Sequence, residues 1–169
     1  MTILETERLL LRELDSATDA EFIFELLNTP KFLKYIGDRG VRSVKQARDF
    51  IENRYRQSYR EHGFGLYTVE LKNEHIPIGL CGFVSRDTLP APDLGFAFLP
   101  DFEGKGYGFE SASALLQFGS EKLGFTRVLA ITSQANDDSV KLLEKLGFRF
   151  DRIFTTSDGE DLKLFEKLL

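Results

Sequence analysis

A glycine-rich stretch, residues 103–108, has the composition of a phosphate-binding loop. It reads Glu-Gly-Lys-Gly-Tyr-Gly, and glycine lets backbone N–H groups face a ligand with no Cβ in the way. The short apolar segment 93–99 before it predicts a buried strand. Apolar residues at helical spacing follow it and stop at Gly124, which predicts a helix. Because a helix N-terminus has unpaired N–H donors and a partial positive charge, this loop can bind phosphate oxygens.

Three glycines before a helix also fit a mobile turn or another phosphate-binding motif. A P-loop requires Ser or Thr after Gly-Lys, but Gly106 follows Lys105. A dinucleotide-binding fold requires an acidic residue about 20 positions later, at the end of the next strand. The next apolar run, residues 128–131, ends instead in Thr132 and Ser133. The spacing therefore disfavours both motifs, and with them a nucleotide-binding regulatory domain.

The loop resembles the acetyl-CoA-binding segment of the GNAT N-acetyltransferases, which reads Q/R-x-x-G-x-G/A. Glu103, Gly106 and Gly108 take its first, fourth and sixth positions. In the RimJ/RimL-like branch the pattern extends to E-I-G-Y-W-L-x-P-x-Y-W-G-K-G-Y-A-T-E-A, and residues 93–111 are similar to it in the same register. A second segment of that branch, N-x-x-S-x-x-x-x-E-K-L-G-F, is matched by residues 136–148.

The resemblance implies an α/β protein with the GNAT fold, built as one domain over residues 1–169. This fold has a mixed, mostly antiparallel sheet of about seven strands, a splayed parallel pair in its middle and helices on both faces. The hydrophobic patterns agree, and predict strands at 8–12, 64–72, 76–85, 93–99, 127–132, 148–154 and 162–167. They predict helices from a Thr18–Glu21 capping box, over 31–36, from a Ser43–Gln46 capping box to Gly63, before Gly124, and from Asn136 to Gly147.

Acetyl-CoA is the cofactor that the resemblance implies, lying like an extra strand between the splayed pair. Main-chain groups near Phe98 and Leu99 would bond its pantetheine amides, and the glycine loop would hold its diphosphate. Asn136 would fix the pantetheine arm, although a plain helix N-cap explains that residue equally well. The implied cofactor-binding residues are Phe98, Leu99, Glu103, Gly104, Lys105, Gly106, Tyr107, Gly108, Asn136 and Ser139.

The implied reaction is transfer of the acetyl group to a primary amine by direct attack on the thioester. Ser139 matches the serine of the RimL-like branch that protonates the leaving thiolate, and Leu143 stands where many relatives have a tyrosine. An ordinary helix serine is the alternative for Ser139. Asp93 stands where the branch has Glu, and is the candidate general base if burial raises its pKa. Glu110 and water are the other candidates, although a carboxylate in a first helical turn is also stabilised by the helix dipole.

The acceptor is a protein N-terminus or a small-molecule amine, and the sequence does not decide between them. Candidate lining residues of its pocket are Phe32, Tyr35, Arg39 and Tyr67. Aromatic residues at such spacing also occur in protein cores. Departures from the family pattern, such as Glu103 for Gln or Arg and Phe109 for a small residue, leave open a catalytically inactive acyl-CoA-binding module.

Composition narrows the class of protein further. A net charge of −5 over 169 residues disfavours sequence-independent binding of nucleic acid. No apolar run approaches the ~20 residues of a membrane span, and no secretory signal is present, so we expect a cytoplasmic monomer or homodimer that does not bind membranes. The only cysteine, Cys81, lies in an apolar run, which predicts a buried, inert thiol and no metal site.

Overall fold

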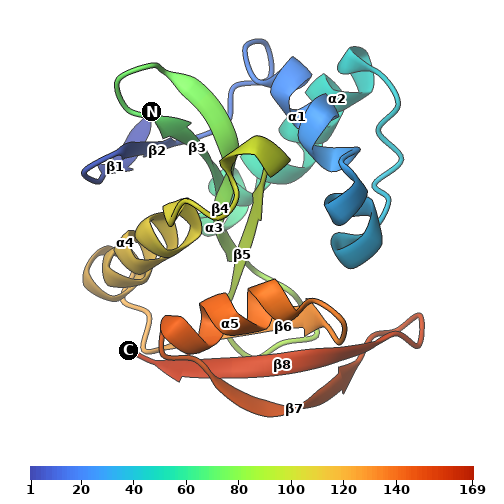
Figure 1. The fold of residues 1–169 in the computed structure, drawn as a ribbon, viewed down its shortest axis with the longest axis vertical. Coiled ribbons are helices and arrows are strands. Elements are labelled where there is room, and N and C mark those ends of the chain that lie inside the picture. Colours follow the sequence, from blue (N-terminus) through green and yellow to red (C-terminus); the bar gives the residue numbers. More distant parts are fainter.

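One sheet runs through the whole molecule and carries helices on both faces in the computed structural model, which describes residues 1–169 (Figure 1). Its strands are β1 (Thr2–Glu5), β2 (Leu9–Arg12), β3 (Leu66–Leu71), β4 (Ile76–Val84), β5 (Asp93–Phe98), β6 (Arg127–Ser133), β7 (Arg149–Thr155) and β8 (Asp161–Leu168). The helices are α1 (Ala20–Leu27), α2 (Val44–Phe50), α3 (Gln57–His62), α4 (Tyr107–Lys122) and α5 (Asp137–Lys145), with π-helical η1 (Phe32–Ile36) and η2 (Ile51–Arg56) and a 3₁₀ turn, η3 (Pro100–Phe102).

The strand order is β1-β2-β3-β4-β5-β6-β8-β7, and β5–β6 is its only parallel pair. The predicted mixed, mostly antiparallel sheet with a parallel pair in the middle is therefore confirmed. The number of strands was underestimated by one, because β1 is a short edge strand that pairs only with β2. None of the helices combines the length and apolar character needed to cross a bilayer.

The first helix begins differently from its prediction. Asp19, not Thr18, is the N-cap of α1, so the Thr18–Glu21 capping box is wrong. The Asp19 carboxylate accepts a hydrogen bond from the N–H of Asp15 and pairs with Arg12, each at 2.8 Å. This buried carboxylate thus ties α1 to β2.

The second capping box is confirmed at its first residue. The hydroxyl of Ser43 accepts a hydrogen bond from the N–H of Gln46 at 3.1 Å and caps α2. The predicted single helix to Gly63 is interrupted by η2, and Gly63 ends it in the left-handed conformation, with φ +77°.

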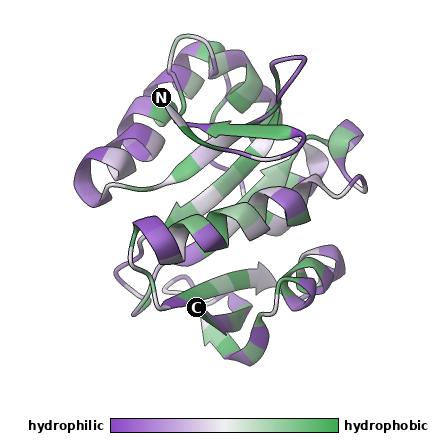
Figure 2. Ribbon diagram, turned by 90° about the vertical axis from the view of Figure 1, so that its left-hand side faces the viewer, coloured by the Kyte–Doolittle hydropathy of each residue, from purple (hydrophilic) through white to green (hydrophobic).

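Two apolar layers enclose the sheet, one on each face. On one face α4 and α5 cover β2–β6 with side chains that include Ala112, Leu115, Leu116, Leu143 and Leu146. On the other face α1, η1, α2 and η2 pack with Ile23, Leu26, Phe32, Ala47 and Ile51. Figure 2 shows the strands mainly apolar and the outer helix surfaces mainly polar. The strands between these layers are held in place from both sides.

The parallel pair β5–β6 is joined by a single bridge, Asp93 with Leu129. Next to it the N–H of Leu129 donates to the carbonyl of Pro92 at 2.9 Å. Beyond the bridge the strands diverge: in Figure 1 β5 stands upright, whereas β6, β8 and β7 run across the lower half. The predicted splay is thus confirmed, and it opens toward the glycine loop that follows β5.

Candidate functional site

The edge of β5 that faces the splay carries unpaired main-chain groups. The N–H of Leu99 donates to the carbonyl of Ile78 at 2.8 Å, so these two residues form a hydrogen-bonded pair of the antiparallel ladder. Such pairs alternate along the ladder, so the N–H and C=O groups of Phe96 and Phe98 point away from β4. Strand β6 pairs with β5 only at Asp93. Phe96 and Phe98 therefore offer donors and acceptors to a ligand that lies in the splay.

The prediction that Leu99 offers free main-chain groups is wrong. Besides its N–H bond to β4, its carbonyl accepts a hydrogen bond from the N–H of Phe102 at 3.0 Å, in the turn η3. The N–H of Leu99 therefore points toward β4, whereas those of Phe96 and Phe98 point away from it. Phe96 lies two residues before Phe98, so its main-chain groups point to the same edge of β5. It was not predicted as a site residue, although this two-residue alternation could have identified it.

The loop after η3 takes a conformation that favours glycine. Gly104 and Gly106 have φ values of +73° and +85°, and a Cβ at Gly104 would meet nothing within 4 Å. Gly106 is the N-cap of α4 and has no side chain to satisfy the first N–H groups of that helix. The N–H groups of Tyr107 and Gly108 are therefore left without an acceptor in the helix and can donate to an anion.

Two buried hydroxyls lie at the end of β6, on the other side of the splay. Thr132 Oγ1 and Ser133 Oγ are both buried and have no hydrogen-bond partner within the chain. An unpaired buried polar group costs about 1–3 kcal/mol. Because neighbouring residues of a strand project to opposite faces of the sheet, the two hydroxyls do not face one ligand together. The free main-chain groups of Phe96 and Phe98 are what fit the pantetheine arm of acetyl-CoA. In the sequence, these two residues of β6 argue only against a dinucleotide-binding fold.

Asn136 and Ser139 lie together at the start of α5. Asn136 Oδ1 accepts a hydrogen bond from the N–H of Ser139 at 3.3 Å, so Asn136 is the N-cap of α5. The Asn136 amide nitrogen and the Ser139 hydroxyl form no hydrogen bond within the chain and are free to bind a ligand. Leu143, at the tyrosine position of other relatives, is fully buried in the core.

Asp93 is buried at the closed end of the splay, with 1% of its surface exposed. Its Oδ1 lies 3.0 Å from Nε of Arg86, in the β4–β5 connection. Burial raises the pKa of Asp93, and the charge and hydrogen bond of Arg86 oppose that shift. Asp93 and Ser139 come from opposite sides of the splay, and no hydrogen bond connects them. Asp93 lies five residues before Phe98, about 16 Å along an extended strand.

Glu110 supports the glycine loop from behind. Its carboxylate accepts hydrogen bonds from the hydroxyl of Thr6 at 2.5 Å and from the N–H of Arg8 at 2.9 Å, and it pairs with the Arg8 side chain at 2.7 Å. Partial burial raises the pKa of Glu110, but the bonds from Thr6 and Arg8 outweigh it, so its pKa is lowered. Arg8 also donates to the carbonyl of Lys105 at 3.0 Å and lies over the ring of Tyr107. These contacts explain Glu110 without a role in proton transfer. The contacts of Arg8 with the glycine loop were not predicted from the sequence.

The predicted acceptor residues do not form one group. Phe32 is buried against the α1–α2 layer, and the guanidinium of Arg39 lies 6.0 Å from the centre of its ring. Tyr35 is half-buried in η1. Tyr67 is only 1% exposed and stacks on Tyr59 with ring centres 5.5 Å apart, so its prediction as a pocket residue is wrong. The alternation of β3 turns its ring into the core.

Cys81 cannot act as a nucleophile in this site. It lies on β4 with no exposed surface, and burial raises the pKa of its thiol to about 12. The predicted buried, inert thiol is confirmed.

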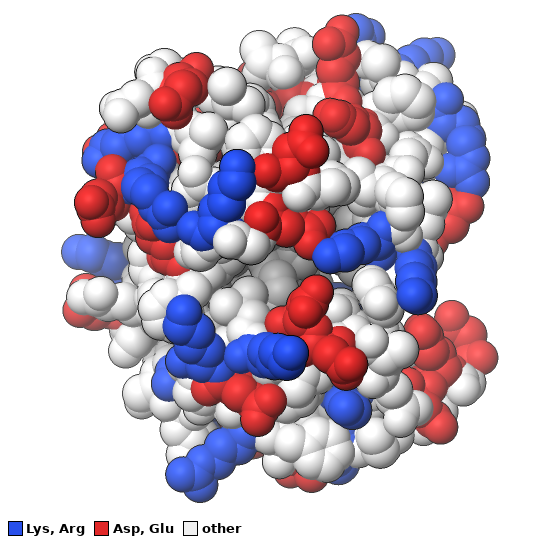
Figure 3. Space-filling view, in the orientation of Figure 1, with Lys and Arg blue, Asp and Glu red and all other residues white.

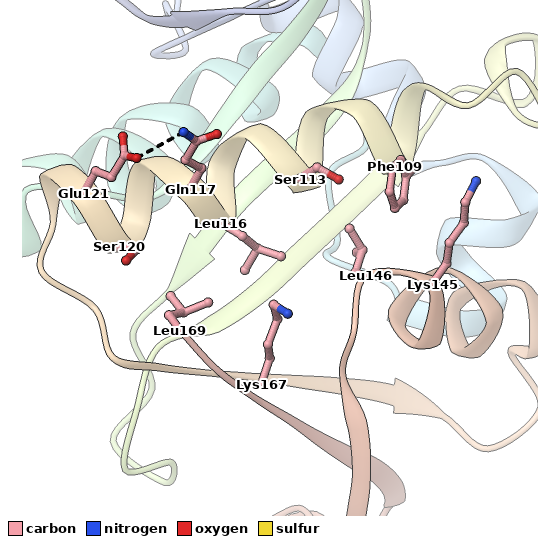
Figure 4. A pocket seen from close by; sticks show the side chains of 10 residues that line it. All are labelled: Phe109, Ser113, Leu116, Gln117, Ser120, Glu121, Lys145, Leu146, Lys167 and Leu169. Carbon is pink, nitrogen blue, oxygen red and sulfur yellow. Dashed lines mark hydrogen bonds between the residues drawn. The ribbon is translucent and has the colours of Figure 1, made fainter.

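Two further cavities lie outside the splay. One of about 560 Å³ lies between α1 and the β5–α4 connection, where Glu21, Glu25 and Asp101 reach its wall. Another of about 380 Å³ lies between α4, α5 and the end of β8 (Figure 4). There Phe109, Leu146 and Lys167 line a groove that contains none of the predicted site residues. The candidate site is the splay with its two rims, which are the loop before α4 and the first turn of α5; we call these rims its lips.

Comparison with known proteins agrees with this geometry. Residues 8–149 match the family model described as an acetyltransferase (GNAT) domain. The uncharacterized N-acetyltransferase YoaA of Bacillus subtilis is 29% identical over 148 residues, which cover 87% of this chain and 82% of YoaA.

Solved structures share the same fold. A GNAT-family acetyltransferase from Bacillus anthracis superposes with a TM-score of 0.81 and 26% identity, covering 99% of this chain and 98% of that one. RimL, a ribosomal L7/L12 α-N-protein acetyltransferase, is 15% identical with a TM-score of 0.83, covering 100% and 94%. The self-immunity acetyltransferase MccE, solved with acetyl-CoA and AMP, is 17% identical with a TM-score of 0.81, covering 97% and 94%. With its matched domain, its splayed strands and its glycine loop, the chain belongs to the GNAT family of acetyltransferases.

Proposed function

We propose that this protein transfers the acetyl group of acetyl-CoA to a primary amine, either a protein N-terminal α-amine or a small-molecule amine, by direct attack of that amine on the thioester. The observation that carries the proposal is the open splay. Its β5 wall holds the free main-chain groups of Phe96 and Phe98. The uncapped start of α4 lies at its mouth.

Different elements of the site bind different portions of acetyl-CoA. The first amides of α4 and the glycines before them bind the diphosphate, because their N–H groups are free and the helix dipole favours an anion. The main-chain groups of Phe96 and Phe98 bond the pantetheine amides as a neighbouring strand would. The side-chain amide of Asn136 contacts the arm from the α5 side, while its oxygen keeps the helix capped.

Bound acetyl-CoA supplies an activated thioester, and the chain supplies the proton transfers. The amine forms a new N–C bond as the C–S bond breaks, so one proton must leave the nitrogen and one must reach the sulfur. Asp93 accepts the first proton, directly or through water, because burial raises its pKa toward that of a useful base. Ser139 delivers the second from its free hydroxyl. A main-chain N–H on the β5 edge stabilises the developing negative charge on the carbonyl oxygen.

The acceptor enters from the α1–η1 side of the sheet. Asp93 and Ala97 have the same parity on β5, and Ala97 packs against the α1–α2 layer. Tyr35 in η1 and Arg39 in the loop that follows η1 are the remaining candidates for acceptor contacts. The name of RimL supports a protein N-terminus as one of the two acceptor classes.

A catalytically inactive acyl-CoA-binding module is the second candidate. The Asp93–Arg86 ion pair favours it, because a base held by a cation accepts protons less readily. Both candidates predict cofactor binding, so only turnover separates them.

The test begins with thermal unfolding of the full chain. At a hundredfold excess over Kd, acetyl-CoA should stabilise the native state by about 2.7 kcal/mol, which raises the melting temperature by roughly 5–10 °C, whereas ATP and NAD should not. The second step measures thiol release from acetyl-CoA with a panel of small amines and N-terminal peptides. Release that depends on an amine supports the transferase. A melting temperature unchanged at saturating acetyl-CoA would contradict the site itself.

A further inference from the structure

Lys31, between α1 and η1, joins the two lips of the splay. Its Nζ lies 2.5 Å from Oε2 of Glu103 and 3.7 Å from Oδ2 of Asp138. Glu103 belongs to the loop before α4, and Asp138 to the first turn of α5. One ammonium group, carried by the acceptor-side layer, therefore connects both walls of the cofactor site. Figure 3 shows side chains of both charges around a hollow in the middle of this face.

The charges around this ammonium matter for an anionic ligand. Glu103 and Asp138 stand where a diphosphate would approach the starts of α4 and α5, and carboxylates at that place repel it. Other cations near the loop are already engaged: Arg8 binds Glu110 and the carbonyl of Lys105, and the Lys105 side chain lies over the ring of Phe102. Lys31 is the cation that lies between the lips.

The Lys31 side chain is also free to move. It is 53% exposed, and an ion pair of this exposure contributes little to stability, so exchanging one anionic partner for another costs little. A lysine ammonium has three donors, enough to keep a carboxylate while it binds a phosphate oxygen. The next residue, Phe32, is buried and fixes the start of η1 beside the site.

We propose that Lys31 is a cofactor-binding residue whose ammonium pairs with the diphosphate of acetyl-CoA and so fastens η1, on the acceptor side, across the mouth of the splay. This proposal rests on the proposed function, since it assumes that acetyl-CoA occupies the splay. Lys31 lies outside both family motifs, in which only main-chain amides are expected to bind the diphosphate. It also explains how a loop that carries Glu103 can hold an anion.

The experiment measures the Kd of CoA by calorimetry for the full-length chain and its variants. Lys31→Met should weaken binding roughly tenfold, as expected for loss of a charge-assisted hydrogen bond. It should also reduce the dependence of Kd on salt concentration. Pantetheine, which lacks the diphosphate, should bind both proteins equally. Lys34→Met, which removes an exposed cation one turn further along η1, is the matched control and should bind CoA like the wild type.

A second background separates diphosphate binding from simple charge neutralisation. In Glu103→Gln/Asp138→Asn both carboxylates are neutral, so a neutralising role for Lys31 no longer exists. If Lys31 binds the diphosphate, adding Lys31→Met to this background again weakens CoA binding roughly tenfold. An unchanged Kd there would overturn the proposal even though the wild type binds CoA. If the wild type itself fails to bind CoA, the proposed function fails first.

Discussion

Arg86 holds the carboxylate of Asp93 at 3.0 Å, at the point where β5 and β6 begin to part. The pair combines a buried carboxylate with a guanidinium that is 40% exposed. The proposed base is therefore placed by its strand and restrained by a residue that can turn toward solvent.

Replacing Asp93 by Asn should remove the acid limb of the pH–rate profile. A base must be ionised to accept a proton, and burial raises the pKa of Asp93, so kcat/KM of the wild type should rise with pH through a value above that of an ordinary Asp. We expect Asp93→Asn to lower kcat/KM about 100-fold and flatten this limb, with CoA binding retained. Asp87→Asn, on the exposed β4–β5 connection, is the control. A wild-type limb that persists in Asp93→Asn would assign proton removal to another group.

Replacing Ser139 by Ala should slow turnover without weakening CoA binding. The hydroxyl forms no hydrogen bond within the chain, so its loss leaves the α5 cap between Asn136 and the Ser139 N–H intact. Loss of a general acid costs about 100-fold in kcat. Steady-state kinetics measures kcat and calorimetry measures the Kd of CoA, with Ser120→Ala on α4 as the control. A Ser139→Ala enzyme that turns over at the wild-type rate would leave this serine no catalytic role.

Replacing Gly106 by Ala should weaken cofactor binding more than the loss of stability explains. At φ +85° a Cβ costs about 1–2 kcal/mol of backbone strain. It would also lie 3.3 Å from Nη2 of Arg8, which contacts the loop proposed to bind the diphosphate. Gly124→Ala carries the same strain at φ +72°, at the far end of α4 and with nothing within 4 Å. Both variants should lower the melting temperature, and only Gly106→Ala should raise the Kd of CoA. Equal Kd values would show that the loop does not bind the anion closely.

Replacing Glu110 by Gln should destabilise the fold more at neutral pH than in acid. The pKa of Glu110 is lowered below its ordinary value of 4.5, so its contribution is present above that value and is lost as pH falls through the lowered pKa. We expect a loss of about 1–2 kcal/mol at pH 7, because the carboxylate accepts bonds from Thr6 and Arg8. Urea unfolding at pH 7 and pH 3 measures the difference, with exposed Glu144→Gln as the control. A loss that is equally large at pH 3 would mean that packing, not charge, is the cause.

The sequence predicted those features that short-range patterns and two ordered motifs determine. Strand β5, the glycine loop and α4 follow one another at fixed spacing, so the splay and the glycine loop at its mouth could be expected. The predictions that failed depended on which strands pair and on where side chains point in the folded chain. The ring of Tyr67 is directed into the core by the pairing of β3, and the N–H of Leu99 bonds the carbonyl of Ile78 on β4. The carboxylate of Asp19 pairs with Arg12 on β2, a contact that the capping pattern did not include.

The contacts of Lys31 could not be predicted for the same reason. Its partners lie 72 and 107 residues further along the chain, and no local pattern links a lysine after Pro30 to the start of α5. Arg8 behind the glycine loop is a similar case, because the sheet brings it to Glu110 from 102 positions away.

The single bridge between β5 and β6 leaves two open strand edges inside the molecule. Open edges are templates on which another polypeptide can add a strand and begin to aggregate. Acetyl-CoA in the splay would cover both edges, so the supply of this metabolite would protect the protein as well as feed its reaction. Removing acetyl-CoA should therefore make this chain more prone to aggregate.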